Sequence, residues 1–343
     1  MRIVLTGGGS GGHVIPNIAL IEQLKDKCEL FYIGSSGIEQ RLIEKFKFVK
    51  FYCYNPPKFK REFALSNLAL PFKFVKAMRQ VKKILQEIKP DKVFSKGGYV
   101  GLPVVLMANK LKIRCIGHES DSSVGLAHKL ALNKYSTFFT AYNIKLPKRK
   151  CNVIKSGAII RQSIYLGERL SGIMETGFNG QRPILLVLGG SLGANSLNKK
   201  IIECSDVLTR SYDCFVICGK GKNNYINQPH IRFVEYCDNI AEVYKCARIA
   251  ITRGGASALA ELACLGIPFI SVPLIKASRR EQEANTDYFV KAGCGFRLNE
   301  ENINPISLES YLTRIEKNYS VLRSASKRIC FDSTVEIAEY LLK

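Results

Sequence analysis

The sequence predicts an α/β protein made of two doubly wound domains. Apolar, strand-like runs alternate with helix-like segments along the whole chain, which is typical of parallel sheets covered by helices. The opening pattern, an apolar run that meets glycines and then a helix, begins at Arg2 and returns at Pro183. The chain has 343 residues, a length that suits two domains better than one.

Each half contains its own series of expected strands. In the first half we predict strands near 2–6, 29–33, 48–53, 92–95, 113–117 and 137–141. In the second half the corresponding runs are 183–188, 213–218, 231–234, 249–252 and 268–272. The polar stretch 167–182 carries four glycines and few large apolar residues, and it predicts a linker. Ligands of such sheets bind outside the carboxyl ends of the strands, where both glycine runs lie.

The net charge of +22 is the strongest signal in the composition. A basic surface suits nucleic acid, an anionic membrane or phosphorylated substrates. No helix-turn-helix, zinc-finger or aromatic RNA-binding motif accompanies the charge, so we expect no nucleic-acid partner. No apolar run approaches the ~20 residues that a membrane-spanning helix needs.

The first glycine loop formally satisfies G-x-G-x-x-G with Gly7, Gly9 and Gly12. A dinucleotide site also needs an acidic residue at the end of the second strand, but that strand runs into Gly34-Ser-Ser. The missing acid disfavours an NAD-dependent oxidoreductase, and a phosphate or sugar neighbour is the better expectation. His13 follows at the helix start, where the helix dipole favours a neutral histidine, the form that a general base needs.

The second half has its own candidate ligand site after the run 249–252. Gly254 and Gly255 lead into a helix start of small residues, which lets a phosphate or sugar approach the helix end. Glu261 follows about two turns on, and a carboxylate can accept hydrogen bonds from two ribose hydroxyls. Gln282 and Asn285 are three residues apart and share a helix face.

These motifs, taken in order, resemble the MurG-type glycosyltransferases of bacterial peptidoglycan synthesis, in glycosyltransferase family 28. The resemblance rests on GGGSGGHVIPNIAL, SKGGYVGLPVVLMANKL, HESDSSVGLAHKLA, GGSLGANSLN, RGGASALAELACLGIPFISVPL and REQEAN, which together cover nearly the whole chain. It implies a GT-B fold, with an acceptor domain over 1–160 and a UDP-sugar domain over 161–324. A last helix, about 325–343, is expected to pack back on the first domain.

The resemblance also implies the reaction. N-acetylglucosamine would pass from UDP-N-acetylglucosamine to the C4 hydroxyl of an undecaprenyl-diphosphate-linked N-acetylmuramoyl peptide (lipid I to lipid II), with inversion. No cofactor and no metal is expected. The enzyme would work peripherally at the cytoplasmic face of the plasma membrane, on an anionic surface. Another GT-B enzyme that uses a UDP-sugar, a glycolipid synthase or an epimerase, stays an alternative.

The substrate-binding residues are those that match the family pattern. They are Ser10, Gly11 and Gly12 in the first glycine loop, Asp121, Arg161, Ser191, Cys237 at the uracil, the helix start Ala256, Ser257, Ala258, Leu259, Ala260 and Glu261, and Gln282. Asp121 departs from the pattern, which usually has an asparagine there. Leu192 replaces a common glutamine, and the usual proline before Arg161 is absent.

Two residues are candidates for the catalytic base. Inversion implies one direct displacement, in which the acceptor hydroxyl loses a proton as UDP leaves. His13 and Glu119 both follow predicted strands and are expected at the site, and His13 is favoured. Helix N-termini and Arg161 are expected to stabilise the charge on the departing UDP.

A segment that is both apolar and basic is the candidate membrane contact. It includes Phe63, Leu68, Phe72 and Lys73, and further basic residues follow at Lys76, Arg79, Lys82 and Lys83. The stripe Val75, Met78, Val81 and Leu85 is predicted to be core instead.

Overall fold

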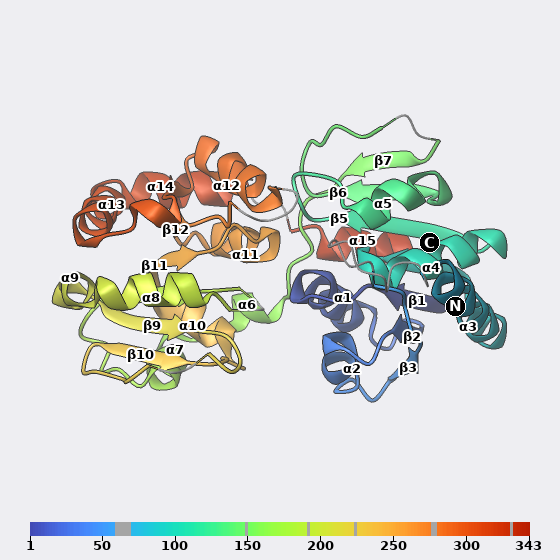
Figure 1. Ribbon diagram of the computed structural model, residues 1–343, viewed down its shortest axis with the longest axis horizontal. Coiled ribbons are helices and arrows are strands. Elements are labelled where there is room, and N and C mark those ends of the chain that lie inside the picture. Colours follow the sequence, from blue (N-terminus) through green and yellow to red (C-terminus); the bar gives the residue numbers. More distant parts are fainter. Residues whose placement is uncertain (59–69, 148–149, 191–192, 223–224, 276–279, 330–331) are drawn as a thin grey trace. The chain divides into compact units, whose positions relative to one another are not determined.

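The computed structural model describes residues 1–58, 70–147, 150–190, 193–222, 225–275, 280–329 and 332–343. The chain forms two compact units, Met1–Arg161 with Asp332–Lys343, and Gln162–Phe331. Each unit contains one parallel sheet with helices on both faces, and the predicted α/β fold class with two doubly wound domains is confirmed (Figure 1).

The first unit is built on a seven-stranded parallel sheet in the order β3-β2-β1-β4-β5-β6-β7. Its central strands are buried on both faces, which is why they read as continuous apolar runs: Ile3, Val4 and Leu5 are all fully buried. The strands are β1 Arg2–Thr6, β2 Glu29–Gly34, β3 Val49–Cys53, β4 Lys92–Ser95, β5 Arg114–Glu119, β6 Thr137–Thr140 and β7 Asn152–Lys155.

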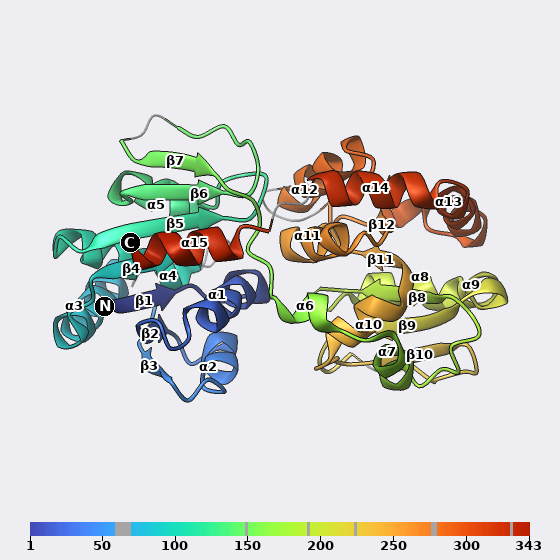
Figure 2. The same ribbon diagram turned by 180° about the vertical axis from the view of Figure 1, so that it is seen from behind.

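Helices cover both faces of this sheet. One face packs against α1 Gly11–Leu24, α2 Ile38–Ile43 and α15 Thr334–Leu342, and the other against α3 Leu70–Ile88, α4 Gly98–Lys110 and α5 Leu126–Ala131. Figure 2 shows α15, drawn in red, beside α1. Chain residues from the two ends of the sequence therefore share one core.

The second unit repeats the arrangement with a six-stranded parallel sheet in the order β10-β9-β8-β11-β12-β13. Both sheets thus show the doubly wound order in which the direction of winding reverses beside the first strand of the unit. The strands are β8 Ile184–Leu188, β9 Asp213–Ile217, β10 Ile231–Val234, β11 Ala247–Thr252, β12 Phe269–Ser271 and β13 Gly295–Arg297.

Helices of the second unit also lie on both faces of its sheet. Views from the two sides show α8 and α10 on opposite faces (Figures 1 and 2). One core joins the sheet to α8, α9, α13 and α14. The helices are α6 Ser163–Leu166, α7 Arg169–Thr176, α8 Asn195–Glu203, α9 Ser205–Ser211, α10 Ile240–Cys246, α11 Ala256–Leu265, α12 Glu281–Lys291, α13 Pro305–Lys317 and α14 Tyr319–Ile329.

The predicted linker at 167–182 is wrong. Residues Arg169–Thr176 form α7, which packs closely on α10. A Cβ on Gly167 or Gly172 would overlap backbone atoms of Ala241 and Glu242, so these glycines permit close helix packing. The linker prediction failed because glycines that allow close helix packing cannot be distinguished in sequence from glycines of a linker.

The segment expected to return to the first domain divides in two. Tyr319–Ile329 forms α14 in the second unit, and only α15 lies in the first. The Ser333 N–H donates to Ala158 O over 2.9 Å, and the Thr334 hydroxyl donates to Ile160 O, also over 2.9 Å. Ile337 is fully buried there in the core of the first unit.

Candidate functional site

The carboxyl ends of β1, β4 and β5 bring three loops together in the first unit. β1 pairs in parallel with β4, Thr6 opposite Ser95, so the loops that follow start side by side. A Cβ on Gly98 would lie 2.7 Å from Gly8 O and 3.3 Å from His13 Nδ1. Gly98 has φ +74°, a left-handed conformation that favours glycine, so this close approach requires a glycine.

The Glu39 side chain fixes the first glycine loop through hydrogen bonds. Its buried carboxylate accepts the N–H groups of Gly9 over 3.3 Å and Ser35 over 3.0 Å, and the Ser35 hydroxyl as well. A Cβ on Gly8 would lie 2.5 Å from this carboxylate, and one on Gly9 would overlap the Tyr99 ring. These glycines therefore serve packing. Glu39 was not predicted as a site residue because it lies beyond the end of β2, on α2.

Ser10, Gly11, Gly12 and His13 lie at the start of α1. Gly11 and Gly12 are its first two residues, so their N–H groups have no acceptor within the helix. The Ser10 hydroxyl lies 2.9 Å from His13 Nδ1. His13 is half-buried. When Nδ1 carries the hydrogen and donates to Ser10, Nε2 keeps the lone pair that a base needs.

A buried lysine connects the β4 and β5 ends. Lys96 Nζ lies 2.5 Å from His118 Nδ1, 3.3 Å from His118 O and 2.7 Å from Ser120 Oγ. His118 Nε2 lies 2.9 Å from Gly157 O, so Nε2 carries the hydrogen and Nδ1 accepts from the ammonium. Burial lowers the pKa of Lys96 to about 8, against the charges of Glu119 and Asp121.

His118 is held neutral by its surroundings. Burial and then the Lys96 charge hold the pKa of His118 well below its usual range. The motifs SKGG and HESD contain Lys96 and His118, but their sequence alone did not predict that the two residues would meet. Their contact depends on the pairing of β4 with β5, Ser95 opposite Gly117, which brings residues 22 apart in sequence side by side.

Glu119 is buried and its carboxylate is occupied by protein hydrogen bonds. Oε2 accepts Gly125 N–H over 2.7 Å and His128 Nδ1 over 3.1 Å, and Oε1 accepts Asp121 N–H over 3.1 Å. Burial raises the pKa of Glu119, but the hydrogen bonds and charge from His128, with Gly125 and Lys96, outweigh it and hold the pKa well below its usual range. A carboxylate stabilised in this way is a weak base, so the geometry favours a positioning role.

His128 packs beneath the β4 loop. Its ring contacts Phe138 and Tyr135 edge-on, with centroids 5.0 Å and 5.8 Å away. A Cβ on Gly97 would lie 2.7 Å from His128 Nε2. The loop after β4 is thus fixed by a histidine on one side and, through Lys96, by β5 on the other.

In the second unit the loops after β8 and β11 lie at neighbouring strand ends. Thr252 of β11 is opposite Leu188 of β8. Among the described residues, a Cβ on Gly190 or Gly255 would meet nothing within 4 Å. These two glycines therefore face open space, in contrast to those of the first loop. Gly254 is different, since a Cβ there would overlap Gln282 O of α12.

The start of α11 presents the groups that suit an anion. Ala256, Ser257 and Ala258 are its first three residues, and their N–H groups lack acceptors within the helix. The side chains of Leu259 and Ala260, which follow, are buried, and Leu259 N–H already donates to Gly255 O over 3.1 Å. Their side chains pack in the interior, so they can shape the site only through the backbone.

Three polar side chains, one on α11 and two on α12, are held by protein hydrogen bonds. The Tyr244 hydroxyl donates to Glu261 Oε2 over 2.9 Å, and Glu261 is buried. The Gln282 side-chain oxygen accepts Leu274 N–H over 2.9 Å. Asn285, fully buried, donates to Gly254 O over 3.1 Å. Asn285 therefore positions the glycine loop.

Arg253 is a buried cation that the sequence analysis missed. It donates to Val272 O over 3.1 Å, Ser196 Oγ over 3.0 Å and Glu300 Oε1 over 2.7 Å. Burial raises the pKa of Glu300, but the Arg253 and Ser196 hydrogen bonds lower it to a net value below the usual one. Arg253 links the ends of β11 and β12 to α8.

The other predicted site residues are more scattered. Cys237 is buried after β10, and burial, then the charge of Glu175, raises its thiol pKa to about 12. Arg161 is half-exposed, and its charge acts on Glu22 of α1. Phe72 is 80% exposed and Lys73 is exposed in the first turn of α3. Ser191, Leu192, Phe63 and Leu68 lie outside the described residues.

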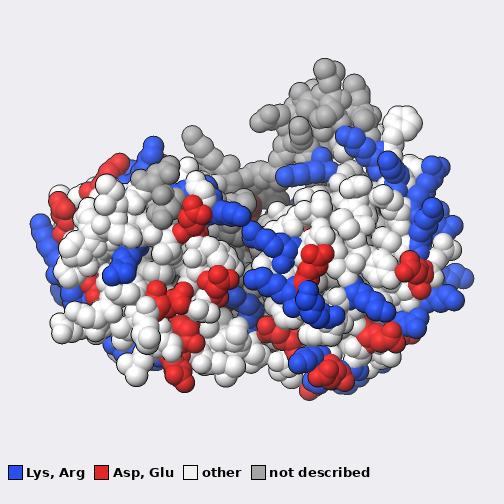
Figure 3. Space-filling view, turned by 90° about the horizontal axis from the view of Figure 1, so that it is seen from below, with Lys and Arg blue, Asp and Glu red and all other residues white. Residues whose placement is uncertain are grey.

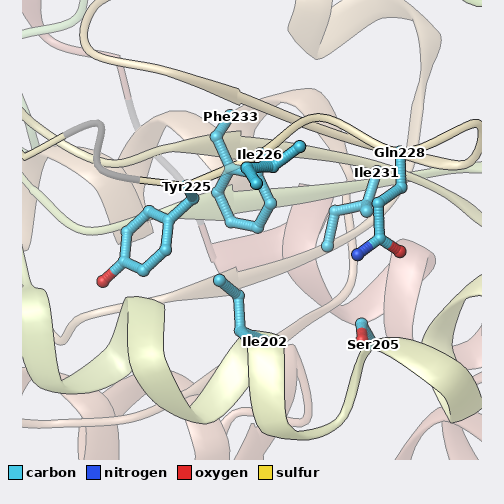
Figure 4. A pocket seen from close by; sticks show the side chains of 7 residues that line it. All are labelled: Ile202, Ser205, Tyr225, Ile226, Gln228, Ile231 and Phe233. Atoms are coloured by element: carbon cyan, nitrogen blue, oxygen red, sulfur yellow. The ribbon is translucent and has the colours of Figure 1, made fainter.

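A small pocket of about 240 Å³ lies elsewhere in the second unit (Figure 4). Ile202, near the end of α8, and Ile231, the first residue of β10, both line it. These positions lie toward the amino ends of the strands, away from the glycine loops, so the pocket is separate from the candidate site.

Across the residues described, no three His, Cys, Asp or Glu side chains are grouped to hold a metal ion. No helix in that part of the chain is both long enough and apolar enough to cross a bilayer.

Two Rossmann-like domains with glycine loops at the carboxyl ends of their strands define the class of GT-B glycosyltransferases. The family 28 N-terminal domain matches residues 3–140, and the family 28 C-terminal domain matches residues 184–339. The chain belongs to glycosyltransferase family 28.

Named relatives cover nearly the whole chain. The chain is 38% identical over 322 residues to a protein of Shouchella clausii, covering 90% of this chain and 89% of that one. It is 36% identical over 351 residues to a protein of Lachnoclostridium phytofermentans, covering 98% of both. Both relatives are named UDP-N-acetylglucosamine–N-acetylmuramyl-(pentapeptide) pyrophosphoryl-undecaprenol N-acetylglucosamine transferase.

Solved structures share the fold. Acinetobacter baumannii MurG superposes with a TM-score of 0.74 at 22% identity, covering 99% of this chain and 98% of that one. The kitacinnamycin glycosyltransferase gives 0.75 at 16% identity, with the same coverage. The predicted GT-B fold is thereby confirmed.

Proposed function

We propose that the protein transfers N-acetylglucosamine from UDP-N-acetylglucosamine to the C4 hydroxyl of an undecaprenyl-diphosphate-linked N-acetylmuramoyl peptide, with inversion. The observation that carries the proposal is the near full-length similarity, 35–38% identical, to relatives named for this transfer. In this proposal the first unit takes the lipid-linked acceptor and the second takes the UDP-sugar.

His13 is the proposed general base. It sits at the start of α1, where the helix dipole favours the neutral ring. Its Nδ1 contact with Ser10 orients the ring and leaves Nε2 as the proton acceptor. Glu119, the other candidate, carries three protein hydrogen bonds and a lowered pKa, so we assign it the positioning of loop 121–125.

The departing UDP is proposed to bind at the carboxyl end of the second sheet, where the glycine loops after β8 and β11 lie. The N–H groups of Ala256, Ser257 and Ala258 would face the diphosphate, where Gly190 and Gly255 leave space. Glu261 would accept the ribose hydroxyls, Cys237 would meet the uracil through its backbone, and Gln282 would contact the sugar. Arg161 would add positive charge as the bond to UDP breaks.

Transfer of labelled sugar to a lipid-linked muramoyl acceptor tests the reaction, and His13→Ala tests the base. We expect His13→Ala to lower kcat by roughly 10²–10⁴, with little change in donor KM. His230→Ala serves as a control, because His230 is 46% exposed and pairs with Asp213 at the other end of the second sheet. Near-full turnover in His13→Ala would reject His13 as the base and return Glu119 as the candidate.

We further propose that the first turn of α3 contacts an anionic membrane at the cytoplasmic face. Phe72 is 80% exposed and Val75 47%, beside exposed Lys73, Lys76 and Arg79. Figure 3 shows Lys and Arg side chains over much of the N-terminal unit on one face. Val81 and Leu85, farther along α3, are buried, as predicted for core residues, whereas Val75 is more exposed than expected.

Vesicle co-sedimentation tests this surface. Each basic residue near anionic headgroups is worth about 1 kcal/mol, so Lys73→Glu with Lys76→Glu should weaken binding to anionic vesicles by at least tenfold. Equal binding of the unmodified protein to neutral and anionic vesicles would refute the electrostatic part. Phe72→Ser probes the apolar part separately.

A further inference from the structure

The Ser120 hydroxyl lies at the carboxyl edge of the first sheet and accepts a hydrogen bond from a buried lysine. Lys96 Nζ donates to Ser120 Oγ over 2.7 Å. An ammonium only donates, so Ser120 is the acceptor in this contact and its own hydroxyl hydrogen points elsewhere. Within the part of the chain that the structure describes, that hydrogen reaches no protein acceptor, and Ser120 is half-exposed.

Lys96 itself is unable to contact a ligand. It is 2% exposed, and its three hydrogens go to His118 Nδ1, His118 O and Ser120 Oγ. Its charge reaches the surface only through the Ser120 hydroxyl, which it polarises. A hydroxyl that accepts from a cation is a stronger donor than an isolated one, because hydrogen bonds in a chain reinforce one another.

The charges around Ser120 indicate what it can bind. Glu119 and Asp121 flank it in sequence, and both carboxylates act on the Lys96 ammonium. An incoming phosphate would face the Asp121 carboxylate and the Glu119 carboxylate, the second already paired with His128, against the single Lys96 ammonium, so the surroundings do not favour an anion. A neutral oxygen, such as a sugar hydroxyl or an acetamido carbonyl, accepts a hydrogen bond without that repulsion.

We propose that Ser120 is a substrate-contacting residue that donates to a neutral oxygen of the acceptor sugar, and that Lys96 is the positioning residue that orients and polarises it. Ser120 lies at the same sheet edge as His13, the proposed base, which must meet the acceptor hydroxyl. The inference rests on the proposed function, because it needs a sugar acceptor at this edge.

Steady-state kinetics of the full-length enzyme with a lipid-linked muramoyl acceptor test the inference. We expect Ser120→Ala to raise acceptor KM about tenfold, the loss of one polarised hydrogen bond, with kcat and donor KM within about twofold. Ser120→Thr keeps the hydroxyl and should restore acceptor KM to within about threefold. Ser324→Ala, on the exposed side of α14, is the matched control and should change nothing.

Lys96→Met and Ser120→Ala together form a double-mutant cycle. The methionine removes the cation and keeps a long, unbranched side chain. The acceptor KM of Lys96→Met should rise as in Ser120→Ala, and Ser120→Ala in that background should add less than about twofold, because both changes remove the same interaction. Should Lys96→Met not fold, the Ser120→Ala and Ser120→Thr pair still decides the question. An unchanged acceptor KM in Ser120→Ala overturns the proposal.

Inhibition by inorganic pyrophosphate separates a sugar contact from a phosphate contact. The inhibition constant should be the same in wild type and Ser120→Ala. An increase that matches the rise in acceptor KM would mean that Ser120 binds an anion, which overturns the neutral-oxygen assignment. Absence of transfer by the wild-type enzyme is a different result: it overturns the proposed function, and this inference with it.

Discussion

The glycine loops at the carboxyl ends of the two sheets share a sequence pattern, but the glycines have different surroundings. The loop after β1 lies in the first unit, and the loops after β8 and β11 lie in the second. In the first unit, a Cβ on Gly8 would meet the Glu39 carboxylate, and one on Gly9 would overlap Tyr99. In the described part of the second unit, a Cβ on Gly190 or Gly255 would meet no atom within 4 Å. Similar strand-glycine-helix sequences thus serve close packing at one edge and leave space for a ligand at the other.

Two buried cations, Lys96 and Arg253, also differ in their surroundings. Lys96 in the first unit contacts a neutral histidine and a half-exposed serine. Arg253 in the second unit is paired with Glu300 and with fixed oxygens. The first arrangement holds a charge with no carboxylate in direct contact, whereas the second neutralises it. Four predictions follow from these contrasts.

Alanine at Gly9 and at Gly255 should have opposite consequences. Gly9 has φ +82° and no room for a methyl group, so Gly9→Ala should lower the free energy of unfolding by about 2–4 kcal/mol. Gly255 has φ −72° and open space, so Gly255→Ala should cost less than about 1 kcal/mol but raise donor KM about tenfold. Urea unfolding measures the stability of both variants, and donor kinetics measure their donor KM. Equal losses of stability in Gly9→Ala and Gly255→Ala would contradict the proposed difference between the two loops.

Removing the charge of Glu39 should loosen the first loop. Glu39→Gln places an amide among the N–H donors of Gly9 and Ser35 and should lower the free energy of unfolding by about 1–3 kcal/mol. Glu44→Gln, at an exposed position just after α2, is the control. A Glu39→Gln variant as stable as the control would show that the carboxylate charge does not hold the loop.

The lysine should make stability depend on pH, and the arginine should not. The folded pKa of Lys96, about 8, lies below its ordinary 10.5, so the unfolded chain binds more protons between these values and stability rises with pH. The difference in unfolding free energy between wild type and Lys96→Met should therefore grow above pH 8, by at most about 1.4 kcal/mol per pH unit.

The matched comparison is Arg253→Met. Arg253 stays charged throughout this range, so its difference from wild type should stay flat. Unfolding series at pH 7.5, 8.5 and 9.5 give both slopes. Parallel curves for Lys96→Met and wild type would contradict the lowered pKa.

The smallest expected effect is at Tyr244. Tyr244→Phe removes the hydroxyl that donates to Glu261 Oε2, and Glu261 is the proposed ribose contact. Donor KM should rise about two- to fivefold, while acceptor KM stays constant. A change in acceptor KM without a change in donor KM would contradict the proposed contact between Glu261 and the donor.

Much of the fold could be predicted from the sequence because buried parallel strands read as apolar runs. β7 and β13 escaped prediction, since Asn152–Lys155 and Gly295–Arg297 are short and not fully buried. The α7 region was misjudged because glycines that allow close helix packing look like linker glycines in sequence.

The candidate site was predicted less completely. Motif spacing located His13, Glu119 and the start of α11, but it did not reveal the pairing of Lys96 with His118, which depends on neighbouring strands. Glu39 escaped because the acid was sought at the end of β2, and it lies on α2 instead. Ionisation states, such as the low pKa of Glu119, depend on burial and partners that are distant in sequence.

The return of α15 to the first unit has a consequence for biosynthesis. Ile337 and Leu341 belong to the interior beside α1, yet they are translated more than 300 residues after it. A ribosome releases residues in order, so the second unit has its complete core available for folding before the first does. A nascent chain that has emerged from the ribosome as far as residue 331, but not as far as α15, should therefore carry a finished second unit and a first unit that protease still attacks.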